Sequence, residues 1–440
     1  MLVMKFGGTS VKDAAALTRV TDIVKAHIRN HSQLLVVLSA TAGTTNRLLD
    51  AAEQAVIDDE SIVTAWRDLV DYHATVARGL IKDDDALQSA IADIQEIGEQ
   101  LHTYLTGMSI LQECTDQSRD TVASFGERWS TTVYSHALRA AGVDAILFDA
   151  ADVVRTNAQH QAAVVDLDET ERLCKSSLVP ALEEHQVVVT QGFIGSTSRG
   201  IMTTLGRGGS DASAAIFGAV LDAEEIKIWT DVSGVYSADP RIVAGARPVP
   251  TMSFGEMREL ALYGAKVLHP DAIAPAVKRG VPVHVCNTFA PDDPGTVITS
   301  NAADHGDIHA VSIVRDCQIL NGSNRSVPMS IRTGNIARRL LLESSSVEHA
   351  MAVVHVPDGR ALTDVVAAVA GQDVDVRNVA LVIATGPKAT STASLERMMG
   401  ALRSIPVLHV CSGISVWSTF VIVQREFGDQ TVHALHDLTY

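Results

Sequence analysis

The sequence is poor in the features that mark several large classes of protein. Lys and Arg form no basic run and the net charge is −17, which argues against a nucleic-acid-binding surface. No segment approaches the roughly 20 apolar residues of a membrane span, and no cleavable leader pattern is visible. We therefore expect a cytoplasmic protein with no nucleic-acid or membrane partner. The five cysteines show no C-x-x-C spacing, so we expect no metal site and no disulfide framework: Cys114, Cys174, Cys286, Cys317 and Cys411.

Two common nucleotide-binding motifs are also missing. The chain has no G-x-x-x-x-G-K-[ST] sequence, which excludes a P-loop protein. Residues 206–211 (GRGGSD) lack the last glycine of the dinucleotide fingerprint. Any phosphate group must therefore be held by a different arrangement.

What the chain has is length and apolar residues arranged in two alternating patterns. At 440 residues with 46% hydrophobic content, two or three domains are expected. Alternating strands and helices predict an α/β fold with a mainly parallel sheet covered on both faces, whose ligands bind at the C-terminal strand ends. The predicted strands are residues 34–38, 145–148, 187–191, 226–230 and 282–286, and the predicted helices are residues 13–30, 128–141, 168–184 and 211–221.

Two further segments depart from this alternation. Residues 50–107 contain no strand pattern and predict a helical excursion, either a lid or part of a subunit interface. Residues 290–306 are rich in Pro, Gly, Asp and Asn, and we place a domain boundary there. The resulting domains are 1–300 and 307–440. From residue 379 onward the pattern reads β, α, β, β, α, which suits helices on one face of a small antiparallel sheet.

The stretch VMKFGGTSV (residues 3–11) places Lys5 in an apolar run and follows it with Gly7 and Gly8. One interpretation is a solvated lysine on an edge strand. The other is an anion site, since the two glycines allow backbone N–H groups to approach a ligand closely. Thr9 and Ser10 are candidate caps for a helix that begins near residue 12.

Four other stretches join polar residues to glycines or helix starts. Arg207 lies between glycines in TTLGRGGSD (203–211), where a guanidinium suits a two-pronged grip on a carboxylate or phosphate, and Asp211 is either a plain N-cap or part of the same site. WTDVSGVYSADPR (229–241) is either a nucleotide-binding loop or a polar surface turn. Lys266 in GAKVLHP is solvated or catalytic, and Glu127 in SFGERWS follows a glycine at an expected helix start.

Taken together, MKFGGTSV, TTLGRGGSD, WTDVSGVYSADPR and GAKVLHP closely resemble, in order and spacing, the motifs of the aspartate kinases of the amino acid kinase superfamily. The resemblance implies a three-layer αβα kinase domain followed by two smaller ACT-like α+β modules, the first about 316–378 and degenerate, the second about 379–440. It implies transfer of a phosphoryl group from ATP to L-aspartate, giving 4-phospho-L-aspartate. It further implies Mg²⁺ held through the ATP phosphates, no metal-ligand set in the protein, and a homodimer.

The resemblance also implies roles for individual residues. Lys5, Gly7, Gly8 and Asp211 would be catalytic, with the glycine N–H groups facing the transferring phosphoryl group. Thr45, Glu127, Arg207 and Ser210 would bind aspartate, Arg207 at its α-carboxylate and Glu127 at its ammonium. The nucleotide side would be formed by Lys5, Gly8, Thr230, Asp231, Tyr236, Arg241 and Lys266.

Two alternatives to an aspartate kinase remain open: a kinase for another small carboxylate, and an amino-acid-binding regulatory protein with a silent kinase domain. Residues 318–340 (QILNGSNRSVPMSIRTGNIARRL) contain Pro328 and lack an apolar helical stripe. In lysine-sensitive relatives this part of the first module carries the effector pocket. We therefore expect weak inhibition by lysine or none.

Overall fold

The computed structural model describes residues 1–31, 33–264, 268, 271–300, 306–322, 340–345, 350–358, 361, 363–365, 367 and 374–439. The chain divides into two compact units. The first contains Met1–Gly234 and Val267–Ser300, and the second contains Val235–Lys266 and Asn301–Tyr440. Each is described below by itself.

The sheet of the first unit runs in the order β3-β4-β2-β1-β7-β9-β10. Neighbouring strands are parallel except for β10, which is antiparallel to β9. Because Phe6 pairs with Leu38 and Trp229, and Leu38 pairs with Gln191, the residues that follow these strands meet at one edge of the sheet. The strands are β1 (Leu2–Phe6), β2 (Leu34–Leu38), β3 (Ala145–Phe148), β4 (Val187–Gln191), β7 (Glu225–Thr230), β9 (Val283–Asn287) and β10 (Thr296–Thr299).

Helices cover both faces of this sheet, which confirms the predicted α/β fold. Met4 and Phe6 belong to a core cluster with residues of α1 (Ala14–Ile28) and α5 (Asp116–Ala140). The side chain of Lys5 points to the other face, as alternation along a strand requires, and reaches Asp211 on α8 (Gly209–Val220). Apart from the helical layer described next, this unit also contains the 3-10 helix η1 (Gly8–Val11), η2 (Ala150–Asp152), α6 (Leu167–Leu173), the π-helical turn η3 (Cys174–Leu178), α7 (Val179–Glu184), β5 (Ile194–Ser196), β6 (Met202–Thr204) and α10 (Ala274–Arg279).

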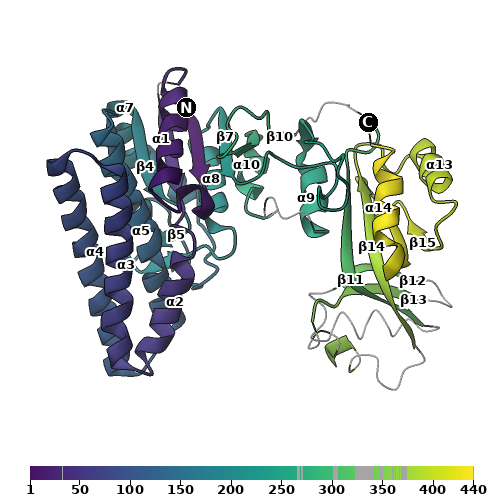
Figure 1. Ribbon diagram of the computed structural model, residues 1–440, viewed down its shortest axis with the longest axis horizontal. Coiled ribbons are helices and arrows are strands. Elements are labelled where there is room, and N and C mark those ends of the chain that lie inside the picture. The colour runs from purple at the N-terminus through teal and green to yellow at the C-terminus, as the bar shows by residue number, and fades with distance from the viewer. Residues whose placement is uncertain are drawn as a thin grey trace. The chain divides into compact units, whose positions relative to one another are not determined.

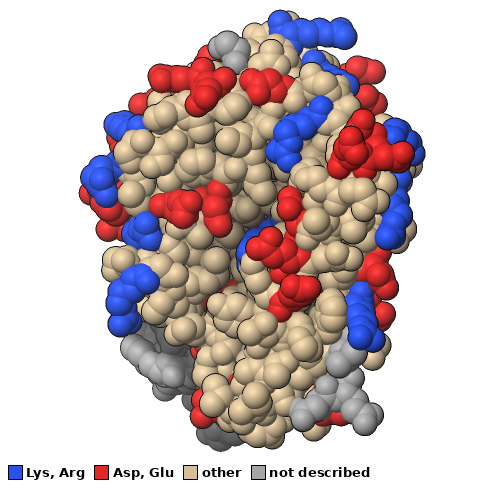
Figure 2. Space-filling view, turned by 90° about the vertical axis from the view of Figure 1, so that its left-hand side faces the viewer, with Lys and Arg blue, Asp and Glu red and all other residues tan. Residues whose placement is uncertain are grey.

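The predicted helical excursion is present as a helical layer, made of α2 (Thr44–Ala55), α3 (Asp59–Leu80), α4 (Asp84–Leu111) and α5. These helices pack against one another, and Figure 1 shows α3, α4 and α5 as long helices side by side. Their ends follow ordinary capping rules, because the Asp83 side chain accepts from the Ala86 N–H and the Thr115 side chain accepts from the Ser118 N–H. Figure 2 views this side of the molecule and shows acidic and basic groups interspersed around a broad uncharged area.

Two local expectations near the N-terminus and in α5 were wrong. The cap of the first long helix is Asp13, whose side chain accepts from the Ala16 N–H, rather than Thr9 or Ser10. Glu127 lies in the middle of α5 and not at a helix start, because that helix begins at the Thr115 cap. The helix dipole therefore does not act on its carboxylate.

The second unit contains an antiparallel sheet in the order β12-β13-β11-β14-β16-β15. The predicted β, α, β, β, α succession from residue 379 is confirmed as β14, α13, β15, β16 and α14. Residues of both helices pack with Val382 and Val421 on one face of the sheet. The elements are β11 (Ala310–Gly322), β12 (Leu340–Ser345), β13 (Ala350–His355), β14 (Val374–Thr385), α13 (Thr392–Ala401), β15 (Val407–Cys411), β16 (Ser418–Gln424), η5 (Arg425–Phe427) and α14 (Gly428–His436).

The segment Val235–Lys266, with β8 (Thr251–Ser253) and α9 (Phe254–Leu262), belongs to the second unit. The Ser237 carbonyl accepts from the Val311 N–H at 2.8 Å, and the Ser237 hydroxyl lies 2.9 Å from His436 Nε2. Nδ1 of His309 lies 2.7 Å from Oε1 of Glu256, and both side chains are at most 1% exposed. The compact units and the predicted domains 1–300 and 307–440 thus divide the chain differently, and the predicted boundaries stay predictions. Residues 323–339, the interior of the segment 318–340, lie outside the described residues. The degeneracy predicted for the first ACT-like module therefore stays a prediction.

No helix in the described part of the chain is both long enough and apolar enough to span a bilayer.

Candidate active site

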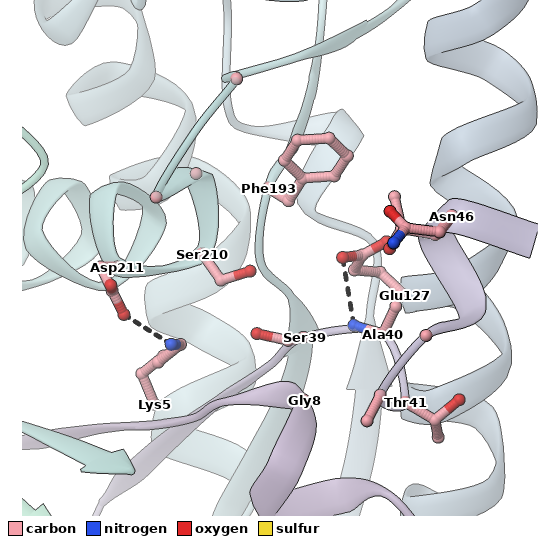
Figure 3. Close-up of a pocket in the computed structure, with 16 residues that line it drawn as sticks. Lys5, Gly8, Ser39, Ala40, Thr41, Asn46, Glu127, Phe193, Ser210 and Asp211 are labelled. Carbon is pink, nitrogen blue, oxygen red and sulfur yellow. Dashed lines mark hydrogen bonds and ion pairs between the residues drawn. The ribbon is translucent and has the colours of Figure 1, made fainter. Parts of the chain in front are cut away.

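A pocket of about 370 Å³ opens at the edge of the first unit's sheet where β1 and β2 end (Figure 3). It brings together six of the residues singled out from the sequence: Lys5, Gly8, Thr45, Glu127, Ser210 and Asp211. The rest of its lining is Ser39, Ala40, Thr41, Ala42, Gly43, Asn46, Phe193, Gly206, Gly208 and Gly209. The site is therefore at the C-terminal strand ends, where a parallel α/β sheet places its ligands.

Lys5 is the cation of this pocket. It lies in the interior strand β1 and is 8% exposed, which excludes a solvated edge-strand lysine. Its Nζ atom lies 2.5 Å from Asp211 Oδ1 (Figure 3). Asp211 is in the first turn of α8, whose N-cap is Gly208, so its carboxylate holds the lysine and does not cap the helix. A buried ammonium needs such a partner until an anionic ligand arrives.

The two glycines after Lys5 have different surroundings. The Gly7 N–H donates to the Trp229 carbonyl at 3.2 Å, joining the ends of β1 and β7. This corrects the expectation that both amides face a phosphoryl group, because the Gly7 donor is already used. Gly8 lines the pocket, and a Cβ atom there would lie 3.0 Å from the Ala40 carbonyl oxygen.

The contrast predicts opposite tolerance to an added methyl group. Gly8→Ala should lower kcat/KM at least about tenfold, because the Cβ pushes on the loop that forms the pocket wall. Gly7→Ala should lower kcat/KM much less. Its Cβ would lie 3.5 Å from the nearest atom, Lys5 Nζ, which is an ordinary van der Waals distance. Steady-state kinetics of both variants, with melting temperatures to confirm folding, check this. Equal losses in the two variants would contradict it.

Glu127 is the buried carboxyl of the pocket. It is 3% exposed, and its Oε1 atom accepts from the Ala40 N–H at 3.1 Å (Figure 3). Its Oε2 atom is buried and has no hydrogen-bond partner in the described part of the chain. Burial raises the pKa of Glu127 to about 8, although the bond from Ala40 acts in the opposite direction. The site therefore carries a carboxyl group that a bound cation would convert to the carboxylate.

The loop between β2 and α2, residues 39–46, forms one wall. Thr45, predicted from the sequence, lies on it together with Ser39 and Asn46, which the sequence reasoning did not single out. Phe193 was also missed; its φ of 68° is uncommon for a non-glycine residue, and its N–H donates to Ser213 Oγ at 2.9 Å. The polar content of residues 39–46 (SATAGTTN) is a signal that could have indicated Ser39 and Asn46, whereas nothing in the sequence marks Phe193.

Arg207 is exposed and does not line the pocket, although its neighbours Gly206 and Gly208 do. Those glycines have φ values of 74° and 72°, the left-handed region that favours glycine. Among the described residues Arg207 has no ion-pair partner. Its guanidinium is thus free to turn toward a ligand, and its role stays a prediction.

The residues predicted for the nucleotide side are divided between the two units. Thr230 ends β7 and Asp231 follows it in the first unit, with the Thr230 hydroxyl donating to Asp231 Oδ1 at 3.2 Å. Tyr236 and Arg241 belong to the second unit, where Arg241 is exposed and pairs with Asp239 at 2.7 Å. Lys266 lies outside the described residues.

The described residues contain no group of three or more His, Cys, Asp or Glu side chains suited to hold a metal ion. The acidic groups of the pocket are Glu127, which is bonded to the loop, and Asp211, which is bonded to Lys5. This donor set fits a magnesium ion carried mainly by nucleotide phosphates.

The family model of the amino acid kinase family matches residues 1–287, which include every residue that lines this pocket. The chain belongs to this family. It is 36% identical to the lysine-sensitive aspartokinase 3 of Escherichia coli, over 73% of the chain and 69% of that relative. It is 29% identical to the bifunctional aspartokinase/homoserine dehydrogenase 2 of Arabidopsis thaliana, over 99% of the chain. The chain spans about half the length of this and other plant relatives.

Solved structures give the same result over the whole chain. The E. coli aspartokinase III complex with lysine and aspartate (T-state) has a TM-score of 0.85 at 29% identity, covering 100% of this chain and 99% of that one. The complex of the same enzyme with aspartate and ADP (R-state) has a TM-score of 0.77 at 29% identity, covering 99% of each chain. The resemblance seen in the motifs is thereby confirmed.

Proposed function

We propose that this chain is an ATP-dependent aspartate kinase. It transfers the γ-phosphoryl group of ATP to the side-chain carboxylate of L-aspartate and forms 4-phospho-L-aspartate, the first step toward the lysine, threonine and methionine group of amino acids. The observation that carries the proposal is a single pocket in which Lys5, held by Asp211, and the buried Glu127 line the same cavity. One group suits a phosphoryl oxygen and the other an ammonium.

The chemistry needs no general base. An aspartate side chain has a pKa of about 4 and is already an anion at neutral pH, so it attacks phosphorus directly. Catalysis then consists of positioning the two anions and neutralising their charge. Lys5 supplies a positive charge within the pocket, and Asp211 fixes the direction of its side chain. Magnesium, bound by the nucleotide, would supply the remaining charge.

Recognition of the amino acid would use the opposite side of the pocket. Glu127 Oε2 has no partner among the described residues, so a substrate ammonium would satisfy a group that is costly to leave buried. Thr45 and Ser210 offer hydroxyls on the same cavity. Arg207, on the glycine loop beside it, would turn inward to hold the α-carboxylate.

The proposed role of Arg207 predicts a selective effect of Arg207→Lys. A lysine keeps the charge and loses the two-pronged geometry, so the KM for aspartate should rise about tenfold or more while that for ATP stays within twofold. Arg199→Lys, at another exposed arginine, is the matched control. A rise confined to the ATP KM would assign Arg207 to the nucleotide instead.

The nucleotide would be bound by Lys5, Gly8, Thr230, Asp231, Tyr236, Arg241 and Lys266, as the family resemblance implies. A homodimer and a cytoplasmic location complete the proposal. Sedimentation of the purified protein tests the dimer, and fractionation of cells that express it tests the location.

A coupled ADP-release assay with a panel of amino acids tests the activity itself. We expect ADP release when aspartate is present. We also expect hydroxylamine to convert the acyl phosphate product to a hydroxamate. Turnover with glutamate or another carboxylate in place of aspartate would make the chain a different kinase of this family. Amino-acid binding with no turnover would make it a regulatory protein with a silent kinase domain.

A further inference from the structure

Three successive residues of the pocket wall are each held by a side chain of the helical layer. The Ser39 carbonyl accepts from Ser130 Oγ at 2.8 Å, and the Ala40 N–H donates to Glu127 at 3.1 Å. The third residue, Thr41, is 2% exposed, and its hydroxyl lies 3.4 Å from Nε2 of His73. Ser130 and Glu127 belong to α5, whereas His73 belongs to α3 of the helical excursion.

The protonation of His73 follows from its other contact. Its Nδ1 atom lies 2.7 Å from the Leu69 carbonyl oxygen, which only accepts, so Nδ1 carries the proton and Nε2 is the acceptor. Burial lowers the pKa of His73 to about 4, so the ring stays neutral near pH 7. In the 3.4 Å contact with Nε2 the donor is therefore the Thr41 hydroxyl, which also lies 2.5 Å from the Thr44 hydroxyl.

The ring of His73 is fixed by packing. It stacks on Trp129 with 4.8 Å between ring centroids and an angle of 20°, and it meets Tyr72 edge to face at 4.9 Å. Trp129 is fully buried, and its Nε1–H donates to the Ile94 carbonyl at 3.0 Å. The Tyr72 hydroxyl donates to the Lys12 carbonyl, just beyond η1. Consecutive residues of α3 thus reach both chain segments that follow the strand ends β1 and β2.

We propose that His73 is a positioning residue for the aspartate pocket, fixing the wall at Thr41 through a hydrogen bond to its hydroxyl. The inference rests on the proposed aspartate kinase activity and deepens it. It gives the helical excursion a definite task, since α3 carries a side chain that acts on the pocket through Thr41. Because Ala40 lies against Gly8, a displaced wall also changes the space beside the phosphoryl position.

His73→Phe tests this tether, because phenylalanine keeps the stacking on Trp129 and removes the acceptor. We expect the aspartate KM to rise about tenfold with kcat lowered less than threefold and the melting temperature little changed. His73→Gln, whose amide oxygen accepts a hydrogen bond, should recover part of the loss. His136→Phe is the matched control, since His136 is also a buried helix histidine but pairs with Asp93, away from the pocket.

A double-mutant cycle with Thr41→Val separates the tether from general packing. The cost of His73→Phe should largely vanish in the Thr41→Val background, because the hydrogen bond is already gone. Fully additive costs, or an aspartate KM in His73→Phe equal to that of the wild type, would overturn the proposal.

Hydrogen exchange keeps the test independent of the activity. Without any ligand, the peptide covering residues 39–46 should exchange faster in His73→Phe than in wild type or His136→Phe. If the wild type does not phosphorylate aspartate, the proposed function fails while this measurement still decides the tether. Unchanged exchange of that peptide would overturn the positioning role.

Discussion

Lys5→Met should lower kcat about 10²–10³-fold and change the aspartate KM far less, because the lysine charge matters most while the phosphoryl group is transferred. The substitution also leaves the Asp211 carboxylate, whose side chain is 17% exposed, without its ammonium partner. We expect that to cost on the order of 1–3 kcal/mol of unfolding free energy. Single-turnover rates and melting temperatures measure the two effects separately.

The matched control for this variant is Lys227→Met. Lys227 lies on the neighbouring strand β7, its side chain is 19% exposed, and it pairs with Glu225 and contacts His27 rather than the pocket. The Lys227→Met substitution also removes a largely buried strand lysine, and it should leave kcat within about twofold of wild type. Near-native kcat in Lys5→Met, or an equal loss in both variants, would remove Lys5 from the catalytic step.

Glu127→Gln should raise the aspartate KM about 10²-fold or more and at the same time stabilise the fold near pH 8. The pKa of Glu127 is about 8 in the folded protein against an ordinary value of 4.5. Between these values the folded state binds more protons than the unfolded state, so wild-type stability falls as the pH rises from 4.5 to 8. The glutamine removes that slope, for a gain on the order of 4 kcal/mol at pH 8.

The same titration predicts how wild-type binding depends on pH. An ammonium is best held by the carboxylate, so the aspartate KM should fall as the pH rises from 6 toward 8. Denaturant unfolding and KM at several pH values check both parts. Glu53→Gln is the control, because Glu53 lies on α2 with its side chain 54% exposed and should change neither profile. A pH-independent aspartate KM in wild type would contradict the proposed role of Glu127.

The strands around the site were predictable because they are short and largely apolar, and β2 and β4 are buried along their whole length. Residues 34–38, 145–148 and 187–191 were predicted with the bounds the structure gives. In contrast, the use of the Gly7 N–H depends on Trp229, more than 200 residues away in the chain. A local pattern cannot reveal a partner at that distance.

Glu127 shows why a correct site residue can be predicted in the wrong element. Gly126 was interpreted as a break before a helix, whereas it lies inside α5. A Cβ atom at this position would lie 2.8 Å from the Ala40 Cβ, so the glycine permits the pocket wall to touch the helix. A glycine that permits close packing and a glycine that ends a helix look the same in a sequence, and only the three-dimensional contact distinguishes them. Phe193 could not be predicted, because an aromatic residue between two strands is more often part of the core than of a polar site.

The path of the chain between the compact units limits how chimaeras of this protein and a relative can be built. The chain leaves the first unit after Gly234, returns at Val267 and leaves again after Ser300. A chimaera joined at residue 306 would keep Ser237 and Glu256 from one parent and take their contact partners, His436 and His309, from the other. The C-terminal region therefore cannot be exchanged between relatives by itself, and a chimaera that folds must take residues 235–266 from the same parent. Drift in that internal stretch and in the C-terminal sheet should accordingly be correlated among descendants of this gene.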